Sequence, residues 1–290
     1  MLLDGAMGSL LASRGVNVSG PAWSARALLE APEAVAAVHR EYAEAGATVH
    51  TVNSFRATEA ALSDWKKVGG PTIDVATLLR RAFEIARASV PSAQRIAASL
   101  APLRDCYEPL VDPEAARLRH RNQLKYLSLE SPDLILCETF ASGTELVVAV
   151  EEASWIGVPV WAALTMGPRG DLQSVAALRE AAARAQEAGA DAVLINCSPA
   201  VSALATFELV RDAGVSGVYA NAGSNGEALG YLVDWGEPEP AADELALRAN
   251  RYADLAGAWV DAGAAIVGGC CGTTPAHIGA IRDRLDKTVT

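Results

Sequence analysis

The sequence predicts an α/β protein that folds as one (β/α)8 barrel of the TIM type. Short apolar runs alternate along the chain with Ala-, Leu-, Glu- and Arg-rich stretches of helical periodicity. No strand–strand hairpin interrupts this alternation, which implies a parallel sheet. The pattern contains eight strand–helix units, and 290 residues suit a barrel of ~250 residues with its loops. Residues 1–290 are therefore expected to form a single domain.

The expected strands are short, rich in Val, Ile, Leu and Ala, and followed by small or polar residues. In chain order they are Leu2–Asp4, Thr48–Val52, Arg95–Leu100, Leu134–Cys137, Val160–Leu164, Ala192–Asn196, Gly217–Ala220 and Ala264–Val267. The helices between and after them show apolar residues at helical spacing. They are Glu33–Ala45, Val75–Ala88, Pro113–Leu129, Thr144–Ile156, Val175–Ala188, Val201–Ala213, Glu244–Ala262 and Pro275–Leu285.

Glycine and proline mark the ends of these helices. A glycine follows five of the helices, at the position where a left-handed backbone conformation ends a helix. These glycines are Gly46, Gly157, Gly189, Gly214 and Gly263. Pro32, Pro113 and Pro275 open helices, where the missing N–H costs little. These glycine and proline positions thus support the same division of the chain into strands and helices.

Charge and hydropathy exclude several classes of partner. The chain has 24 Lys and Arg against 35 Asp and Glu, a net charge of −11, which argues against nucleic acid and anionic membranes as partners. No apolar run reaches ~18 residues, so no membrane span is expected. Asp4 interrupts the start of the chain, and no signal peptide is recognisable. We expect a cytoplasmic protein that acts on small molecules, with five reduced cysteines.

Three cysteines fall where the predicted strands end. Cys270 and Cys271 lie in a Gly-Gly-Cys-Cys-Gly tract after the last strand, and Cys197 follows the sixth strand. In a barrel the carboxyl ends of the strands meet at one mouth, so the three thiols are expected to converge. Three thiolates hold a tetrahedral Zn²⁺ with its fourth position open, as in catalytic sites. Cys106 and Cys137 are interpreted as an ordinary loop thiol and a strand residue.

Two carboxylates are expected at the same mouth. Asp4 ends the first strand and Glu138 directly follows the fourth, and together they could bind an ammonium group. The backbone N–H groups of Gly5–Gly8 could bind a carboxylate, so the pair of features suits an amino acid. A helix cap or a solvated surface position is the alternative for either carboxylate. His39, His50, His120 and His277 have no partner that the sequence identifies, and we interpret them as structural.

The two longest connections, 101–112 and 221–243, also leave carboxyl ends of strands. Long ordered loops in a compact domain are usually functional. Their Tyr107, Glu108, Tyr231 and Trp235 are candidates for contacting a cationic substrate.

Taken together, the residues at the strand ends resemble the homocysteine S-methyltransferase family. The resemblance extends from Leu3 to Ile278 and is carried by six segments. They are Asp4-Gly5-Ala6-Met7-Gly8, Asn53-Ser54-Phe55, Glu138-Thr139, Asn196-Cys197-Ser198, Asn221-Ala222-Gly223 and Gly268-Gly269-Cys270-Cys271-Gly272-Thr273. It implies that Cys197, Cys270 and Cys271 bind zinc, that Asp4 and Glu138 bind the homocysteine amino group, and that Asn221 lies near the metal.

The implied reaction is methyl transfer from an onium donor, S-methylmethionine or S-adenosylmethionine, to zinc-bound homocysteine, which gives methionine. Two alternatives stay open. One is a methyltransferase that works with a separate corrinoid protein, since the chain shows no cobalamin or folate module of its own. The other is a non-catalytic zinc-binding barrel, although no fourth Cys or His is obviously placed to close a structural site.

Overall fold

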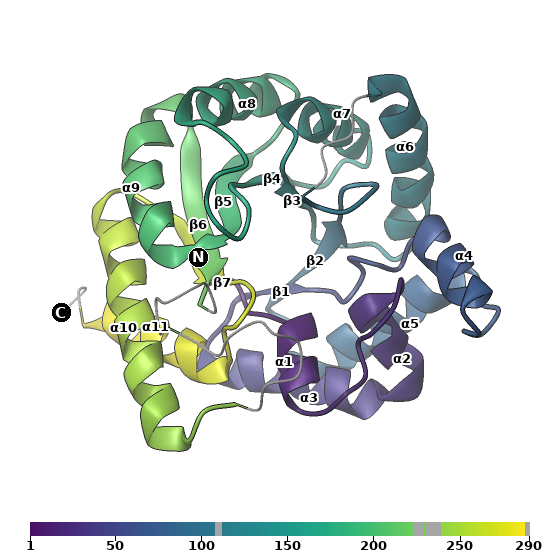
Figure 1. The fold of residues 1–290 in the computed structure, drawn as a ribbon, viewed down its shortest axis with the longest axis horizontal. Helices are drawn as coiled ribbons and strands as arrows, with labels where there is room; N and C mark the ends of the chain where they lie inside the picture. The colour runs from purple at the N-terminus through teal and green to yellow at the C-terminus, as the bar shows by residue number, and fades with distance from the viewer. Residues whose placement is uncertain (108–111, 223–228, 230–238, 288–290) are drawn as a thin grey trace.

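The computed structural model describes residues 1–107, 112–222, 229 and 239–287. Seven parallel strands form one sheet in sequential order β1 to β7, and the helices surround it (Figure 1). The strands are β1 Val49–Thr51, β2 Arg95–Leu100, β3 Leu134–Phe140, β4 Val160–Thr165, β5 Ala192–Pro199, β6 Val215–Asn221 and β7 Ile266–Gly269. The prediction of an α/β barrel is confirmed.

The first expected strand, Leu2–Asp4, is reduced to two parallel bridges that close the ring. Leu2 pairs with Val267 of β7 and Leu3 pairs with Val49 of β1. The pairing ends there because the Asp4 side chain, not a backbone carbonyl, accepts the N–H of Thr51, at 2.8 Å. The amino terminus thus occupies the gap between β7 and β1, and the Asp4 carboxylate lies where this short segment ends.

Eight main helices follow the strands in the expected order. They are α3 Pro32–Ala45, α5 Val75–Ser89, α6 Pro113–Leu129, α7 Gly143–Ser154, α8 Val175–Glu187, α9 Ala200–Val210, α10 Ala242–Asp261 and α11 Pro275–Asp286. Short helices that the sequence analysis did not predict are α1 Gly8–Ser13, η1 Trp23–Arg26, α2 Ala27–Glu30 and α4 Glu59–Lys67, and the end of the helix expected over Val201–Ala213 forms the separate 3-10 helix η2 Arg211–Ala213. All five glycines expected after helices have positive φ angles. No helix in the described ranges is long and apolar enough to cross a membrane.

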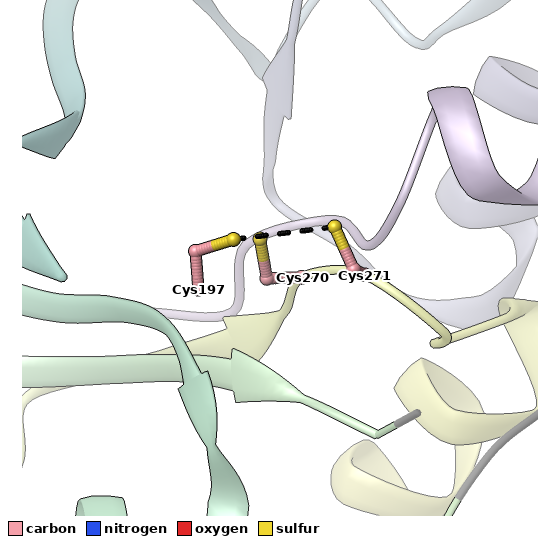
Figure 2. A group of neighbouring side chains, drawn as sticks. All are labelled: Cys197, Cys270 and Cys271. Carbon is pink, nitrogen blue, oxygen red and sulfur yellow. Dashed lines mark hydrogen bonds between the residues drawn. The ribbon is translucent and has the colours of Figure 1, made fainter. Parts of the chain in front are cut away.

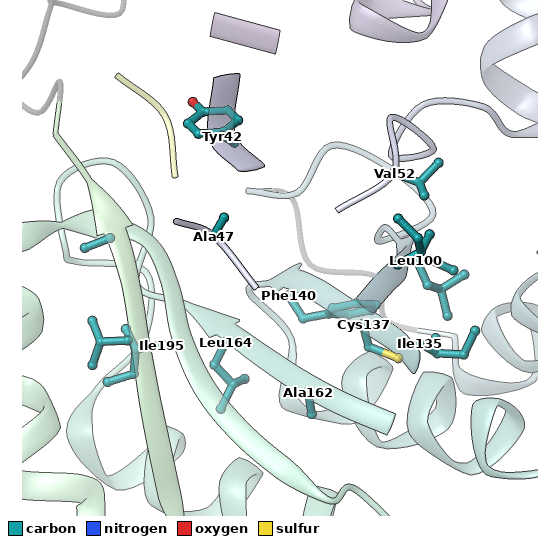
Figure 3. Close-up of a cluster of buried hydrophobic side chains, with 14 of the residues drawn as sticks. Tyr42, Ala47, Val52, Leu100, Ile135, Cys137, Phe140, Ala162, Leu164 and Ile195 are labelled. Atoms are coloured by element: carbon teal, nitrogen blue, oxygen red, sulfur yellow. The ribbon is translucent and has the colours of Figure 1, made fainter. Parts of the chain in front are cut away.

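Strand residues alternate between two cores. Leu134 and Leu136 of β3 pack inside the barrel, whereas Ile135 and Cys137 face the layer between strands and helices. Figure 3 shows Cys137 in that outer layer among apolar side chains. This alternation confirms that Cys137 is a buried strand residue. Glu138 has the same parity as Leu134 and Leu136, so it faces the inside of the barrel.

Candidate active site

The carboxyl ends of the strands surround a cavity of about 1610 Å³. All six residues singled out from the sequence line it: Asp4, Glu138, Cys197, Asn221, Cys270 and Cys271. They come from the amino-terminal bridge, β3, β5, β6 and the segment that follows β7. Residues up to 267 positions apart thus share one pocket because parallel strands end on the same side of a barrel.

The three sulfur atoms lie close together. Figure 2 shows the Cys197, Cys270 and Cys271 side chains directed toward one another from two sides of the mouth. Their sulfurs all lie within 4.8 Å of one another, and the Cys197 and Cys271 sulfurs are 4.0 Å apart. Four ligands at a Zn–S distance of about 2.3 Å stand about 3.8 Å apart in a tetrahedron. The spacing therefore fits a zinc ion with little movement.

Backbone hydrogen bonds hold the Cys-Cys tract in this position. The Cys270 N–H donates to the Ala220 carbonyl, and the Ala222 N–H donates to the Cys271 carbonyl, both at 2.9 Å. Gly272 has a φ of 79°, which favours glycine. A Cβ at Gly269 would lie 2.4 Å from the Thr273 hydroxyl oxygen, so a side chain does not fit there. Glycine at these two positions thus allows the close turn that brings Cys270 and Cys271 to the cavity.

Three non-glycine residues that line the cavity have strained backbone conformations: Trp23, with a φ of 43°, and two residues at strand ends. Thr139 has a φ of 66° and Cys197 a φ of 46°. Asn196 connects them: its side chain accepts from the Thr139 N–H at 3.2 Å and donates to the Thr139 hydroxyl at 2.8 Å. Such strain persists only where surrounding contacts enforce it, and it concentrates at functional sites. Here it fixes the residues directly after Glu138 and Asn196.

The thiols form a mutually hydrogen-bonded group. The thiols of Cys270 and Cys271 bond to the Cys197 sulfur, which lowers the pKa of Cys197 well below its usual value. The same bonds to Cys197 raise the pKa values of Cys270 and Cys271. One thiolate shared among three sulfurs is a donor set ready for a thiophilic cation. Asn221, which also bonds to Cys197, has a buried side-chain oxygen with no partner among the described residues.

The two carboxylates are held from neighbouring strands. Thr51 donates to Asp4 through its N–H at 2.8 Å and through its hydroxyl at 3.1 Å. Burial raises the pKa of Asp4 well above its usual value. Ser99 donates to one oxygen of Glu138 and Tyr219 to the other, at 3.3 Å. Burial raises the pKa of Glu138 to about 7.

These environments do not match the alternative interpretation of the carboxylates. Asp4 is 4% exposed, and neither group caps a helix. A buried carboxylate is costly unless a cation compensates it, and no Lys or Arg among the described residues is paired with either one. Two such groups beside one cavity favour a cationic ligand.

Several cavity residues were not recognised from the sequence. Tyr219 lies inside a strand, where an aromatic residue is typical of any sheet, so no signal distinguished it. Trp23 lies on the unexpected helix η1. Arg56 directly follows the strand-end segment Asn53-Ser54-Phe55, and this position could have identified it. Trp23, Phe55 and Arg56 all line the cavity.

The structure describes only some of the loop residues that were expected near the substrate. The Tyr107 hydroxyl lies 3.2 Å from the Cys197 sulfur, so this loop does reach the thiols. Cys106, interpreted as an ordinary loop thiol, also lines the cavity, and burial raises its pKa. Of the backbone N–H groups considered for a carboxylate, that of Ala6 donates to Thr273 at 3.1 Å. Glu108, Tyr231 and Trp235 lie outside the described residues.

Comparisons with known proteins identify the family of this chain. The family model of homocysteine S-methyltransferase matches residues 1–285. Betaine–homocysteine S-methyltransferase 1 of Mus musculus is 31% identical over 97% of this chain and 71% of its own length. Homocysteine S-methyltransferase of Escherichia coli strain K12 is 30% identical over 98% and 94%.

A solved structure gives the same result for the fold. The homocysteine methyltransferase MmuM from Escherichia coli, in its metallated form, superposes with a TM-score of 0.75 at 26% identity. The match covers 98% of this chain and 96% of that chain.

Proposed function

Because the chain belongs to the homocysteine S-methyltransferase family and is a methyltransferase that acts on homocysteine, we propose that the transfer depends on zinc. The proposed ligands are Cys197, Cys270 and Cys271, and the proposed donor is the sulfonium S-methylmethionine or S-adenosylmethionine. The observation that carries the proposal is the set of three sulfurs within 4.8 Å of one another at the cavity wall. The metallated form of the MmuM structure supports it.

Bound at the three sulfurs, zinc would lower the pKa of the homocysteine thiol, which is ordinarily near ~8.5, so that the sulfur reacts as a thiolate at neutral pH. The chain must then orient the amino acid. Asp4 and Glu138 bind its ammonium group, which supplies the cation that both buried carboxylates lack. Asn221, beside Cys197, has a side-chain oxygen free to accept from the same ligand.

The reaction is a displacement at the donor's methyl carbon. The homocysteine sulfur forms a bond to that carbon, and the bond between the carbon and the donor sulfonium breaks. The bonding electrons leave with the donor sulfur, which becomes a neutral thioether, and the thiol proton has already passed to solvent water. The protein contributes alignment of the two sulfurs and the carbon, and exclusion of water.

The cavity has features that suit a sulfonium. Trp23, Phe55 and Tyr107 supply aromatic faces, and Asp64 and Asp105 supply negative charge at its wall. Aromatic faces and carboxylates both attract cations. A volume of about 1610 Å³ exceeds the 300–1,000 Å³ usual for a single small ligand, so it has room for homocysteine and a donor together.

The proposal is tested by measuring methionine formation from homocysteine with S-methylmethionine, S-adenosylmethionine or betaine as the donor. We expect activity with a sulfonium, loss on chelation, and recovery when zinc is returned. Activity with betaine alone would refute the proposed donor class. Activity that appears only when a methylated corrinoid protein is supplied would support the alternative with a separate partner, and full activity in a chelated sample would refute zinc dependence.

The five free cysteines in the structure suit a reducing compartment, so we also propose a cytoplasmic location. Fractionation of the native host with a compartment marker tests this assignment, and recovery outside the cytoplasmic fraction would overturn it.

A further inference from the structure

A second group of metal-ligating side chains lies behind the cavity wall, in the layer between the barrel and its helices. It consists of Asp4, His39 of α3 and His50 of β1, and one ligand atom of each lies within 4.8 Å of the other two. Val49, which precedes His50 in β1, packs inside the barrel, so the His50 side chain faces outward toward the helices. Both imidazoles are 0% exposed.

The two rings are poorly satisfied for buried polar groups. Neither nitrogen of His39 has a hydrogen-bond partner among the described residues. His50 Nε2 lies 2.8 Å from the side-chain oxygen of Gln94, which can only accept, so the proton is on Nε2. The Ala47 backbone also bonds to this ring, and its Nδ1, with a lone pair, makes no close hydrogen bond within the described ranges. A ring that donates one N–H to an oxygen and presents its other nitrogen is the usual state of a metal-ligating histidine.

Protonation does not compete for these lone pairs near neutral pH. Burial lowers the pKa of His39 to about 3 and also lowers the pKa of His50, so both rings are neutral. Burial raises the pKa of Asp4 in the metal-free protein, and a bound cation would favour its carboxylate form. Its two bonds from Thr51 use one lone pair on each oxygen and leave another on each.

We propose that Asp4, His39 and His50 form a second metal site, which binds a divalent transition-metal ion through two imidazoles and one carboxylate. Three atoms no more than 4.8 Å apart always leave a point that lies within about 2.8 Å of all three, against about 2.0–2.2 Å for zinc bound to such ligands. Binding of a metal ion at these distances thus requires each of the three side chains to move by less than about 1 Å. Asp4 also lines the cavity, which gives an ion a way in, and its two oxygens allow one to bind the ion while the other binds the substrate ammonium group.

Binding of Co²⁺ to the chelator-treated protein tests the second site separately from methyl transfer. In the Cys197→Ser/Cys270→Ser/Cys271→Ser variant we expect one Co²⁺ per chain, with visible d–d absorption but no sulfur-to-cobalt charge-transfer band. The parent should bind two. Binding of no Co²⁺ by this variant would overturn the proposal, whereas it would leave the proposed zinc-dependent reaction untouched.

His50 and His120 provide a matched comparison in the same triple-serine background. Both are fully buried, both have Nε2 bonded to a side-chain oxygen, and both have an Nδ1 that makes no close hydrogen bond, but His120 belongs to no three-ligand group within the described ranges. We expect His50→Gln to weaken Co²⁺ binding by at least about tenfold and His120→Gln to leave it unchanged. Equal affinity in the two variants would refute the assignment. His39→Gln serves in place of His50→Gln if circular dichroism shows that the latter does not fold.

Discussion

Replacing Glu138 by glutamine should weaken substrate binding and yet stabilise the fold at alkaline pH. The carboxylate is buried beside Ser99 and Tyr219, and burial raises its pKa from 4.5 to about 7. The folded state therefore holds a proton that the unfolded state has lost between these two pH values. The cost of ionising Glu138 in the folded state grows as pH rises from 4.5 and is complete above about 7.

The size of this effect follows from the pKa difference. At 1.36 kcal/mol per pKa unit it corresponds to about 3 kcal/mol, and partial exposure of Glu138 lowers the expectation to about 2 kcal/mol. Glutamine does not ionise and avoids the cost. In metal-free protein, the unfolding free energy of Glu138→Gln relative to the parent should rise by about 2 kcal/mol between pH 4.5 and pH 8. Urea denaturation at several pH values measures this difference.

Glu152 provides a control of opposite sign. Its hydrogen bond from Arg121, followed by that from Arg117, lowers the pKa of this buried carboxylate. It thus contributes stability above its unfolded pKa that is lost in acid, so Glu152→Gln should be most destabilising near neutral pH. A Glu138→Gln variant whose relative stability falls or stays constant as pH rises would refute the reasoning about burial.

The same substitution tests the proposed role in binding. Loss of a charge-assisted hydrogen bond costs ~1.5–3 kcal/mol, so the homocysteine KM at pH 8 should rise about tenfold to a hundredfold. Parent affinity should increase with pH through about 7 as Glu138 ionises, and this dependence should disappear in Glu138→Gln. Unchanged homocysteine affinity in the variant, measured by titration, would show that Glu138 does not bind the ammonium group.

Three further predictions concern the proposed metal and substrate sites. Cys270→Ser/Cys271→Ser should lose the sulfur-to-cobalt charge-transfer band of the Co²⁺-substituted protein, and a band of parental intensity would contradict the ligand assignment. Chelation should abolish methyl transfer while circular dichroism stays near native, because a 290-residue barrel buries enough apolar surface without a metal; unfolding on chelation would make the site structural. Asp4→Asn should raise the homocysteine KM about tenfold to a hundredfold without changing the metal content of the three-cysteine site, and an unaltered affinity in titration would refute its role.

The sequence alone determined the fold class and the residues of the mouth. Apolar periodicity and glycine punctuation depend on local backbone preferences, so β2 and α6 begin and end where predicted. The rule that parallel strands end on one face was enough to bring Cys197 to the Cys270–Cys271 pair.

Only the tertiary structure decided the environments of these residues. The first strand shrank to two bridges because an Asp4 side chain replaced a backbone acceptor, which no local pattern encodes. Helix η1, which carries Trp23 to the cavity, forms in a segment without clear periodicity. Burial in the folded barrel raises the pKa of Glu138, and the hydrogen bonds that oppose this rise come from Ser99 of β2 and Tyr219 of β6, both distant in sequence. Likewise, His39 and His50 each look structural in isolation, and their placement around Asp4 arises only when α3 packs against β1. Local preference sets the elements, whereas desolvation and ligand geometry depend on contacts between elements far apart in the chain.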